Sequence, residues 1–441
     1  MQEVEKHSTP LVVKLALGVA IFGLAFPIYG ISFGLFKLTA FRAGIFLLVP
    51  LLFTYGFRFK NRYSANILVL FFIFALIRTS SLLLISENKG SGLQQLVWFL
   101  EGVLFLLIVN SFSQRFEDFF KSFLRLVFFI CSVSIIAMAI QFIMLLFGGS
   151  WLLPFSTSQF GYEEATRYWT YPFQGGQVIG PFWEYNMAGS MCAFFFALFL
   201  PYAFEESNIM RINRFVIRAI LIVTVFALIG TGSKQGFLAM LVASWVLILK
   251  NRVYKKLATV LLLLSVVSAT FLIVKTTDTS LLRLLPQTTF DRYETGMAYG
   301  DLSGGRIGYM RELLGTVNLD NIAFGIGEGM GIHAAHNAYL ITLQEDGLIG
   351  LLFLVWLSFY FLYKTSVVRW GAQPGSPYFP LKVSAIGIVL VWILLIFINW
   401  AQMNVSLSFL YLPAALMYLN HSSEMTRGLV RIDLQGRKNH S

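Results

Sequence analysis

The chain has 441 residues, of which 57% are hydrophobic and only 12% are charged. Soluble domains carry about 25% charged residues, so a chain of this composition cannot cover a water-facing surface, and a soluble fold is excluded. We interpret the net charge of +11 as loop charge that orients membrane spans, which argues against a nucleic-acid partner. Cys131 and Cys192 both lie in apolar runs, which argues against a disulfide framework or a zinc site.

Long apolar runs recur along the chain and predict an all-α integral membrane protein with about twelve transmembrane helices. A β-barrel would need alternating segments of about ten residues, and the apolar runs here are near-continuous and longer. The predicted spans are residues 11–30, 35–56, 64–85, 93–112, 122–147, 182–203, 215–232, 235–250, 257–274, 338–363, 383–400 and 404–420.

Basic residues predict how these spans are oriented. The first run follows the N-terminal segment without a small-residue cleavage site, so we expect an uncleaved first helix. Most basic residues lie in the two tails and in the connections at 57–63, 113–121, 204–214, 251–256 and 364–382. Because positive loops stay on the cytoplasmic side, we expect a single polytopic domain over residues 1–441, with both termini inside and a cytoplasmic tail at 421–441.

Two of the predicted outward connections are long. Residues 148–181 form an extracytoplasmic loop rich in tryptophan and tyrosine, whose aromatic rings suit either sugar stacking or a membrane-interface belt. Residues 275–337 form a larger extracytoplasmic loop between the ninth and tenth spans, with glycine, arginine and histidine in a patterned order. Loops this long are usually functional or disordered, and the pattern favours function.

Three charged residues fall inside predicted spans. Arg78 and Glu101 lie at similar distances from the short connection between the third and fourth spans. We therefore expect a structural ion pair between them, because an unpaired charge is expensive in a membrane, with a substrate contact as the alternative. Arg42 has no obvious partner in the sequence, and it suits either a cavity or a phosphate contact.

The segment before the tenth span carries the residues best suited to chemistry. Arg306 and Arg311 offer planar forks for phosphate oxygens, and the glycine-rich stretch at 325–331 allows close backbone approach to a ligand. His336 can take a proton near neutral pH. Together these residues predict a site at the outer face for a phosphorylated donor that is attacked by a hydroxyl group.

Simpler interpretations of the same residues remain open. The glycine-rich stretch also suits a flexible loop, and Arg306 also suits a headgroup anchor. His333 and His336, with Glu328 as the nearest third ligand, are weak support for a metal, so no metal is expected. Glu345 follows His336 by nine positions, which on a continuous helix is the opposite side, so Glu345 is expected to brace the helix.

A second candidate lies in the turn between the seventh and eighth predicted spans. Lys234 stands there at the start of a predicted helix. A helix start attracts anions and lysine adds a full charge, which together predict a phosphate contact. The alternative is an interfacial lysine whose ammonium extends to water.

The sequence HNAYLITLQEDGLIG resembles the signature of the O-antigen ligase and O-antigen polymerase family of bacterial membrane glycosyltransferases. The matching positions are His336, Asn337, Tyr339, Leu340, Leu343, Glu345, Gly347 and Gly350. Arg306, the Gly-x-Gly pair at Gly325 and Gly327, and the turn ending at Lys234 add to the resemblance. It covers mainly residues 220–360, and the span layout extends it over the chain.

The resemblance implies a GT-C-like fold in the bacterial plasma membrane and an undecaprenyl-diphosphate-linked oligosaccharide as donor. Arg306 and Lys234 would hold the diphosphate, with Arg311 beside them, and His336 would activate an acceptor hydroxyl without metal or cofactor. Asn337, Tyr339, Glu345, Gly325 and Gly327 would support them. Lys234 departs from the family, which commonly has arginine there, and a lysine cannot make the bidentate contact.

The resemblance leaves two activities open. One is an inverting polysaccharide polymerase that acts on a sugar hydroxyl, and the other is a ligase that moves finished glycan to lipid A core or another acceptor. Either enzyme would have its active site at the exterior face of the membrane and would work with other polysaccharide-assembly proteins. A transporter or flippase for lipid-linked sugars is the alternative from a different class, because many transporters have twelve spans.

Overall fold

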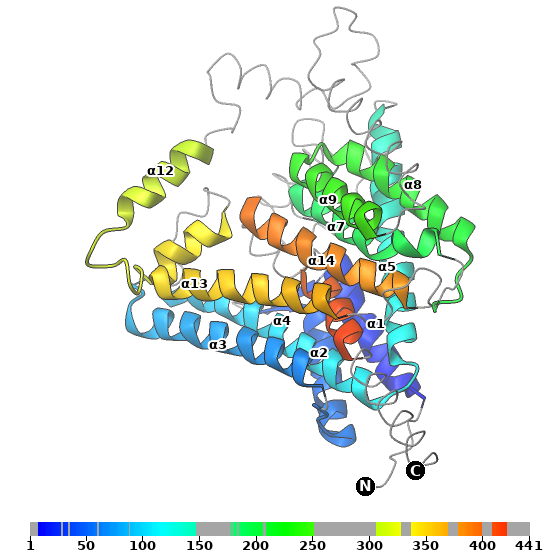
Figure 1. Ribbon diagram of the computed structural model, residues 1–441, viewed down its shortest axis with the longest axis horizontal. Helices are drawn as coiled ribbons and strands as arrows, with labels where there is room; N and C mark the ends of the chain where they lie inside the picture. Colours follow the sequence, from blue (N-terminus) through cyan, green and yellow to red (C-terminus); the bar gives the residue numbers. More distant parts are fainter. Residues whose placement is uncertain are drawn as a thin grey trace, which may run out of the picture.

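The computed structural model describes most of the predicted membrane region and part of the predicted catalytic loop (Figure 1). The described residues are 8–27, 30–33, 36–59, 61–87, 89–146, 178, 180–182, 185–205, 209–250, 306–327, 337–368, 378–398 and 408–420. The tail at 421–441, nearly all of the aromatic loop at 148–181 and the ninth predicted span at 257–274 lie outside them.

The described part of the chain is mostly helical, as the apolar runs predict. Its helices are α1 (Leu11–Ala25), α2 (Ala40–Tyr55), α3 (Arg62–Leu84), α4 (Lys89–Arg115), α5 (Phe119–Leu146), α7 (Tyr185–Phe199), α8 (Arg214–Thr231), α9 (Lys234–Lys250), α12 (Arg306–Thr316), α13 (Ala338–Val367) and α14 (Phe379–Ile398), with a short 3-10 helix η1 (Pro201–Ala203). Residues 408–420 are helical as well. Every predicted span except the ninth overlaps a described helix, although several bounds differ.

Six helices of the described part are long and apolar enough to cross a membrane, which supports a helical membrane protein. The six segments are Arg62–Leu84, Gly92–Arg115, Phe119–Met144, Arg214–Thr231, Ala338–Val367 and Phe379–Phe397. Three further apolar helices, α1, α2 and α7, are shorter.

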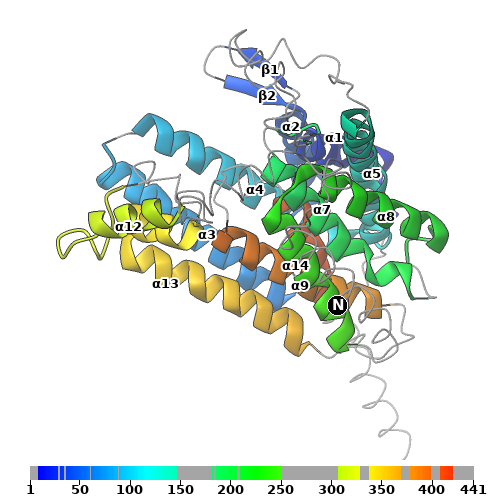
Figure 2. The ribbon, with the colours of Figure 1, turned by 90° about the horizontal axis from the view of Figure 1, so that it is seen from above.

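A small hairpin replaces the predicted start of the second span. β1 (Gly30–Phe33) pairs antiparallel with β2 (Phe36–Thr39), with Gly30 opposite Thr39, and Figure 2 shows the hairpin projecting beyond α2. The helix expected over 35–56 therefore begins only at Ala40. The reason is local, because the Thr39 side chain accepts a hydrogen bond from the Arg42 backbone N–H and caps α2.

A short helix lies inside the predicted loop at 275–337. α12 has 11 residues, which is about 16 Å of helix and too short to cross hydrocarbon of about 30 Å. A series of turns at 319–324 follows it. The segments 275–305 and 328–336 of the same loop lie outside the described residues.

The N-terminal segment and two of the predicted inward connections lie together at one end of the helix bundle. Asp118, between α4 and α5, accepts hydrogen bonds from the Thr9 backbone N–H and hydroxyl, each at 2.6 Å, and from Lys14 Nζ at 3.0 Å. The backbone N–H of Arg58, between α2 and α3, donates to Ser111 Oγ near the end of α4 at 2.9 Å. These contacts join the N-terminal segment and two predicted cytoplasmic connections.

A buried polar cluster ties the end of helix 408–420 to the same region. Its members are Asn61, Ser64, Asn110, Ser113, Gln114 and Asn420. Asn420 Nδ2 donates to Asn110 Oδ1 at 2.9 Å and to Ser113 Oγ at 2.8 Å, and Asn61 Nδ2 donates to the Leu419 carbonyl. Buried polar groups need such partners, so the cluster sets which helix ends meet here.

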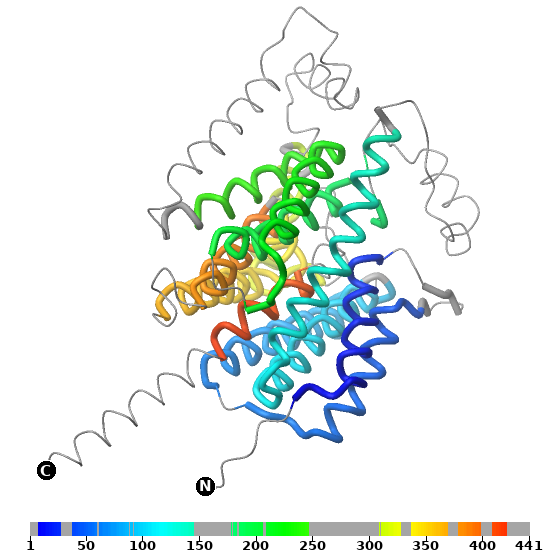
Figure 3. Tube along the Cα trace, turned by 90° about the vertical axis from the view of Figure 1, so that its right-hand side faces the viewer, coloured from blue at the N-terminus to red at the C-terminus, as the bar shows by residue number. Residues whose placement is uncertain are grey.

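α5 connects the N-terminal helices with α7, α8 and α9. It packs against α1 and α8, and Figure 3 shows it running from beside α1 and α2 toward the green helices. α14 packs against α7, α9 and α13, and α13 packs against α3. α14 therefore joins the α7–α9 group to the part of the bundle that holds α3 and α13.

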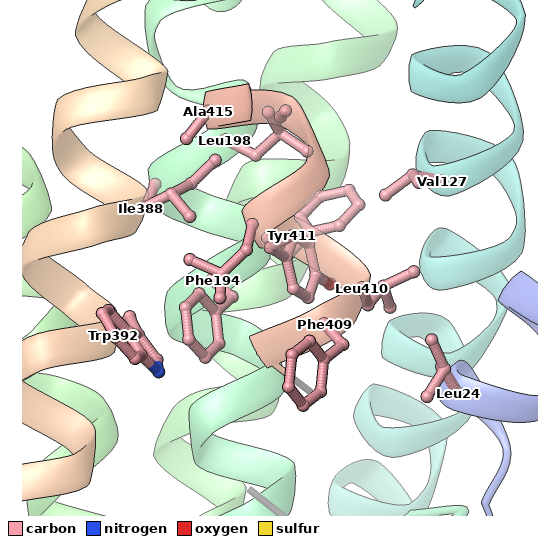
Figure 4. Close-up of a cluster of buried hydrophobic side chains, with 14 of the residues drawn as sticks. Leu24, Val127, Phe194, Leu198, Ile388, Trp392, Phe409, Leu410, Tyr411 and Ala415 are labelled. Carbon is pink, nitrogen blue, oxygen red and sulfur yellow. The ribbon is translucent and has the colours of Figure 1, made fainter. Parts of the chain in front are cut away.

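The core lies around α7 and helix 408–420. Residues 186–199 of α7 and all residues of 408–420 are buried, as expected for helices that are apolar on every side. Figure 4 shows Phe194 against Tyr411, with Ile388 and Trp392 of α14 beside them. The rings of Phe194 and Tyr411 are stacked, with centroids 5.2 Å apart.

Candidate functional site

α13 folds back on itself at Gly347, where φ is 71° and ψ is −167°. Tyr339 Oη donates to Ser358 Oγ at 3.3 Å across 19 positions, which on a straight helix would be roughly 28 Å apart. Residues 338–346 form the short part of α13 before the break, and residues 348–367 form the long part after it. We call them the first and the second half of α13, and the hydrogen bond shows that they lie alongside each other. The single continuous helix expected over 338–363 is wrong. The Asp-Gly dipeptide at 346–347 is the turn signal that could have predicted this break.

The turn at 319–327 docks into the break. Leu348 N–H donates to the Ile322 carbonyl at 2.7 Å, Ile326 N–H to the Gln344 carbonyl at 2.8 Å, and Gly327 N–H to the Glu345 carbonyl at 3.0 Å. These bonds pair backbone groups that the interrupted helix leaves open, which apolar surroundings require. At Gly347 a Cβ atom would collide with the Ala323 carbonyl, so the docked arrangement needs glycine there.

The predicted glycine pair lies at this junction. Gly325 and Gly327 have φ of +76° and +103°, a region that favours glycine. A Cβ atom on Gly325 would collide with the Glu345 carbonyl, and one on Gly327 would collide with the backbone of Ser86. The close backbone approach that these glycines permit is therefore to α13 and to the end of α3.

A buried charge cluster holds the break against α3. Arg78 Nη2 lies 3.7 Å from Glu345 Oε2, and Arg78 Nε lies 3.9 Å from Asp346 Oδ2. Ser81, one turn after Arg78, donates from Oγ to the Glu345 carbonyl at 2.9 Å. Glu345 thus braces the helix, as the sequence predicts, and its partner is Arg78.

The predicted ion pair between Arg78 and Glu101 is wrong. Glu101 Oε1 instead accepts a hydrogen bond from Arg42 Nε at 2.7 Å, which gives Arg42 the partner that the sequence did not reveal. The short connection between α3 and α4 allowed the depth of Arg78 and Glu101 to be estimated. It did not show toward which neighbouring helix each side chain points. Arg78 and Ser81 share the face of α3 that meets α13, whereas Arg42 lies near the start of α2, opposite α4.

The turn before α9 is fixed by buried polar contacts. Gly232 ends α8 in the left-handed conformation, and Ser233 Oγ accepts a hydrogen bond from the Gly236 N–H at 3.3 Å. Gln235 Nε2 donates to the Asn186 carbonyl on α7 at 3.2 Å. Lys234 is the first residue of α9, as predicted, and its side chain is exposed.

The N-terminal ends of α12 and of the first half of α13 point the same way. α12 packs against α13, and Gln344 Nε2 donates to Thr316 Oγ1 at 2.8 Å. Leu313 of α12 is buried. Figure 1 shows the two helices running in the same direction from their first residues. Arg306 is the first residue of α12, and the Asn337 side chain caps α13 by accepting from the Leu340 N–H at 3.0 Å.

The remaining candidates are distributed differently. Arg311 is exposed on α12. His336 directly precedes the cap residue Asn337, but its own position lies outside the described residues, as do those of His333 and Glu328. Lys234 begins α9, which packs against α7 and α14. Among the described residues no cluster of histidine, cysteine and carboxylates could hold a metal ion.

Comparisons with known proteins do not assign the chain to a family. No protein-family model matches it, and no curated protein gives a significant match. Its function is therefore argued from the residues and their arrangement.

Proposed function

We propose that the chain is a membrane glycosyltransferase that transfers glycan from an undecaprenyl-diphosphate-linked donor to a sugar hydroxyl. The observation that carries the proposal is the fold-back of α13 at Gly347. It brings the start of the first half, which follows His336 in the sequence, beside Ser358 and close to Phe397 of α14. Half-helix N-termini of this kind point at anionic substrate groups in other membrane proteins, and each carries about half a positive charge.

The diphosphate of such a donor is the leaving group. Negative charge grows on its bridging oxygen as the glycosidic bond breaks, and preorganised cations that stabilise this charge usually supply the largest catalytic term. Arg306 begins α12, whose N-terminal end points the same way as that of α13 (Figure 1). We assign the diphosphate contact to Arg306, with Arg311 and Lys234 as further cations.

His336 has the role of general base in this proposal. A neutral imidazole accepts the proton of the attacking hydroxyl, which typically contributes about 10²–10⁴-fold to the rate. A single displacement inverts the anomeric centre and requires neither metal nor cofactor. Arg78 and Glu345 hold the bend of α13 and act as positioning residues.

The proposal includes about twelve spans, with both termini in the bacterial cytoplasm and the site at the outer face. This orientation is supported by the segments that lie at the two ends of α3. Asn61, ahead of α3, lies among the basic connections, whereas Ser86, after α3, adjoins Gly327. The 23 residues of α3 separate these two ends by about 34 Å, and the positive-inside rule assigns the first of them to the cytoplasm.

Two other functions remain as alternatives. A ligase would use the same site with lipid A core or another acceptor, and exchanging purified acceptors distinguishes it from a polymerase, which lengthens the lipid-linked product. A transporter of lipid-linked sugars is favoured by one observation, the interrupted helix α13, because broken helices are common at transporter binding sites. Movement of the lipid-linked donor from one leaflet of a vesicle membrane to the other, without formation of a glycosidic bond, would identify a transporter.

The test is glycan assembly by the reconstituted chain with a lipid-linked oligosaccharide. We expect near-total loss of product with His336→Ala and with Arg306→Ala. Lys121→Ala, at the predicted cytoplasmic end of α5, is the matched control and should retain activity. Normal assembly by both site variants would refute the catalytic assignment, provided that all variants unfold at the same temperature as the parent.

A further inference from the structure

Apolar side chains are exposed on α12 and on the turns that follow it. Leu314 is 49% exposed, Leu319 92%, Ile322 40% and Phe324 62%. We call these four residues the apolar rim. A large apolar patch that is exposed on a protein surface marks a contact with a protein, a membrane or a ligand. The rim belongs to a segment too short to span a bilayer, so its exposure has to be explained separately from the transmembrane helices.

The rim continues an apolar stripe along the second half of α13. Six of its side chains are exposed at helical spacing of three or four: Ile349, Leu352, Trp356, Phe359, Tyr363 and Val367. From Ile349 to Val367 the stripe is about 27 Å long, close to a hydrocarbon thickness of about 30 Å. Lys364 lies over the Tyr363 and Tyr63 rings near its far end, an arrangement typical of a membrane interface. The stripe therefore faces lipid.

Backbone hydrogen bonds attach the rim to the near end of this stripe. The carbonyls of Ile322 and Ala323 accept from the N–H groups of Leu348 and Ile349 at 2.7 and 3.4 Å. The rim thus begins where the lipid-facing stripe begins, at the level where hydrocarbon meets headgroups.

Hydrogen bonds from and to side chains pair several backbone groups in the turn of the rim segment, which lowers the cost of placing it at that level. Asn318 Oδ1 accepts hydrogen bonds from the backbone N–H groups of Asp320 and Asn321, and Asn321 Nδ2 donates to the Thr316 carbonyl. Arg311 is exposed one turn before Leu314, and a cation in this position attracts anionic headgroups.

We propose that the apolar rim is seated in the phospholipid monolayer, so that residues 314–324 are a membrane-embedded support for α12. A loop surrounded by water would leave the rim exposed, whereas the lipid that surrounds the adjoining stripe of α13 would cover the rim without a further partner. The proposal does not depend on the glycosyltransferase function. It states that α12 is held at headgroup level by its own connection to α13.

The test is nitroxide accessibility in vesicles of phosphatidylcholine and phosphatidylglycerol. Leu319→Cys and Phe324→Cys are labelled one at a time, with Leu352→Cys as the lipid-facing reference and Glu117→Cys as the water-facing reference. The native Cys131 and Cys192 are fully buried, and the parent chain gives the background labelling. We expect oxygen accessibility relative to a water-soluble nickel chelate to be several-fold higher at 319 and 324 than at Glu117.

Two outcomes of the nitroxide measurement would overturn the proposal. A ratio at 319 and 324 equal to that at Glu117 would mean that the rim lies in water, and shielding from both oxygen and nickel would mean that protein covers it. The unsubstituted chain provides a second test that needs no variant to fold. A photoactivatable phosphatidylcholine should label a peptide covering residues 314–324, and absence of label there, with label on the stripe of α13, would also overturn it.

Discussion

Arg78 on α3 and Glu345 on α13 form a buried ion pair, with 3.7 Å between Arg78 Nη2 and Glu345 Oε2 and side chains only 3% and 1% exposed. The pair lies at the bend where the chain turns back before entering the second half of α13. Because Asp346 adjoins the same guanidinium, one arginine is shared between two carboxylates. The position of the candidate site therefore depends on α3, a helix that carries none of the proposed catalytic residues.

Replacing Arg78 should destabilise the protein strongly. Removing one partner of a buried ion pair leaves an uncompensated charge, which costs about 3–5 kcal/mol in soluble proteins. We expect Arg78→Met to lower the thermal unfolding temperature in detergent far more than Lys14→Ala. Lys14 pairs with Asp118 at a partly exposed position, where pairs contribute about 0–1 kcal/mol. Equal effects of the two substitutions would contradict the structural role of Arg78.

Gly347→Ala should disrupt the bend of α13. An alanine would be strained at φ 71° and ψ −167° and would collide with the Ala323 carbonyl, at a cost of about 1–3 kcal/mol for the backbone alone. We expect faster hydrogen exchange at Leu348 and Ile326, whose N–H groups bond across the junction. Gly315→Ala is the control, because open space surrounds that position, and it should leave exchange unchanged.

The docking of α1 should weaken in acid. Burial alone would raise the pKa of Asp118, but hydrogen bonds from Thr9 and Lys14 and the charge of Lys14 bring that pKa below its ordinary value. A lowered carboxyl pKa contributes stability above the unfolded-state value of about 3.9, and that stability is lost as pH falls through the folded value. Proteolysis near Thr9 should therefore accelerate below about pH 4. The Asp118→Asn variant should be cleaved faster than the parent at neutral pH, and its cleavage rate should no longer depend on pH in this range. A variant with the same pH profile as the parent would contradict the assignment.

Lys234→Arg should retain partial activity if the proposed function is correct. Arginine keeps the positive charge at the first residue of α9, but its planar fork contacts phosphate with a different geometry from an ammonium group. We expect an initial rate of glycan assembly below that of the parent and above that of Lys234→Gln, measured at the same donor concentration. Full activity of Lys234→Gln would remove Lys234 from the site.

Features that depend on short stretches of chain were predictable. Apolar runs predicted the positions of the described spanning helices, and the glycine-serine turn predicted that Lys234 begins a helix. The hairpin at 30–39 was missed, because its residues are as apolar as the span beside it and Thr39 caps the following helix. α12 was missed because it lies in a long connection without a strong apolar pattern.

The sequence by itself determined that this is a helical membrane protein, because hydrocarbon selects long apolar segments whose backbones bond internally. Only the tertiary structure decided which charges meet: Arg42 with Glu101, and Arg78 with Glu345 and Asp346. The depth of a residue follows from counting along one helix, whereas its partner depends on how helices rotate and pack. The fold-back at Gly347 likewise depends on a docked turn from elsewhere in the chain, which supplies the backbone partners that let the helix break.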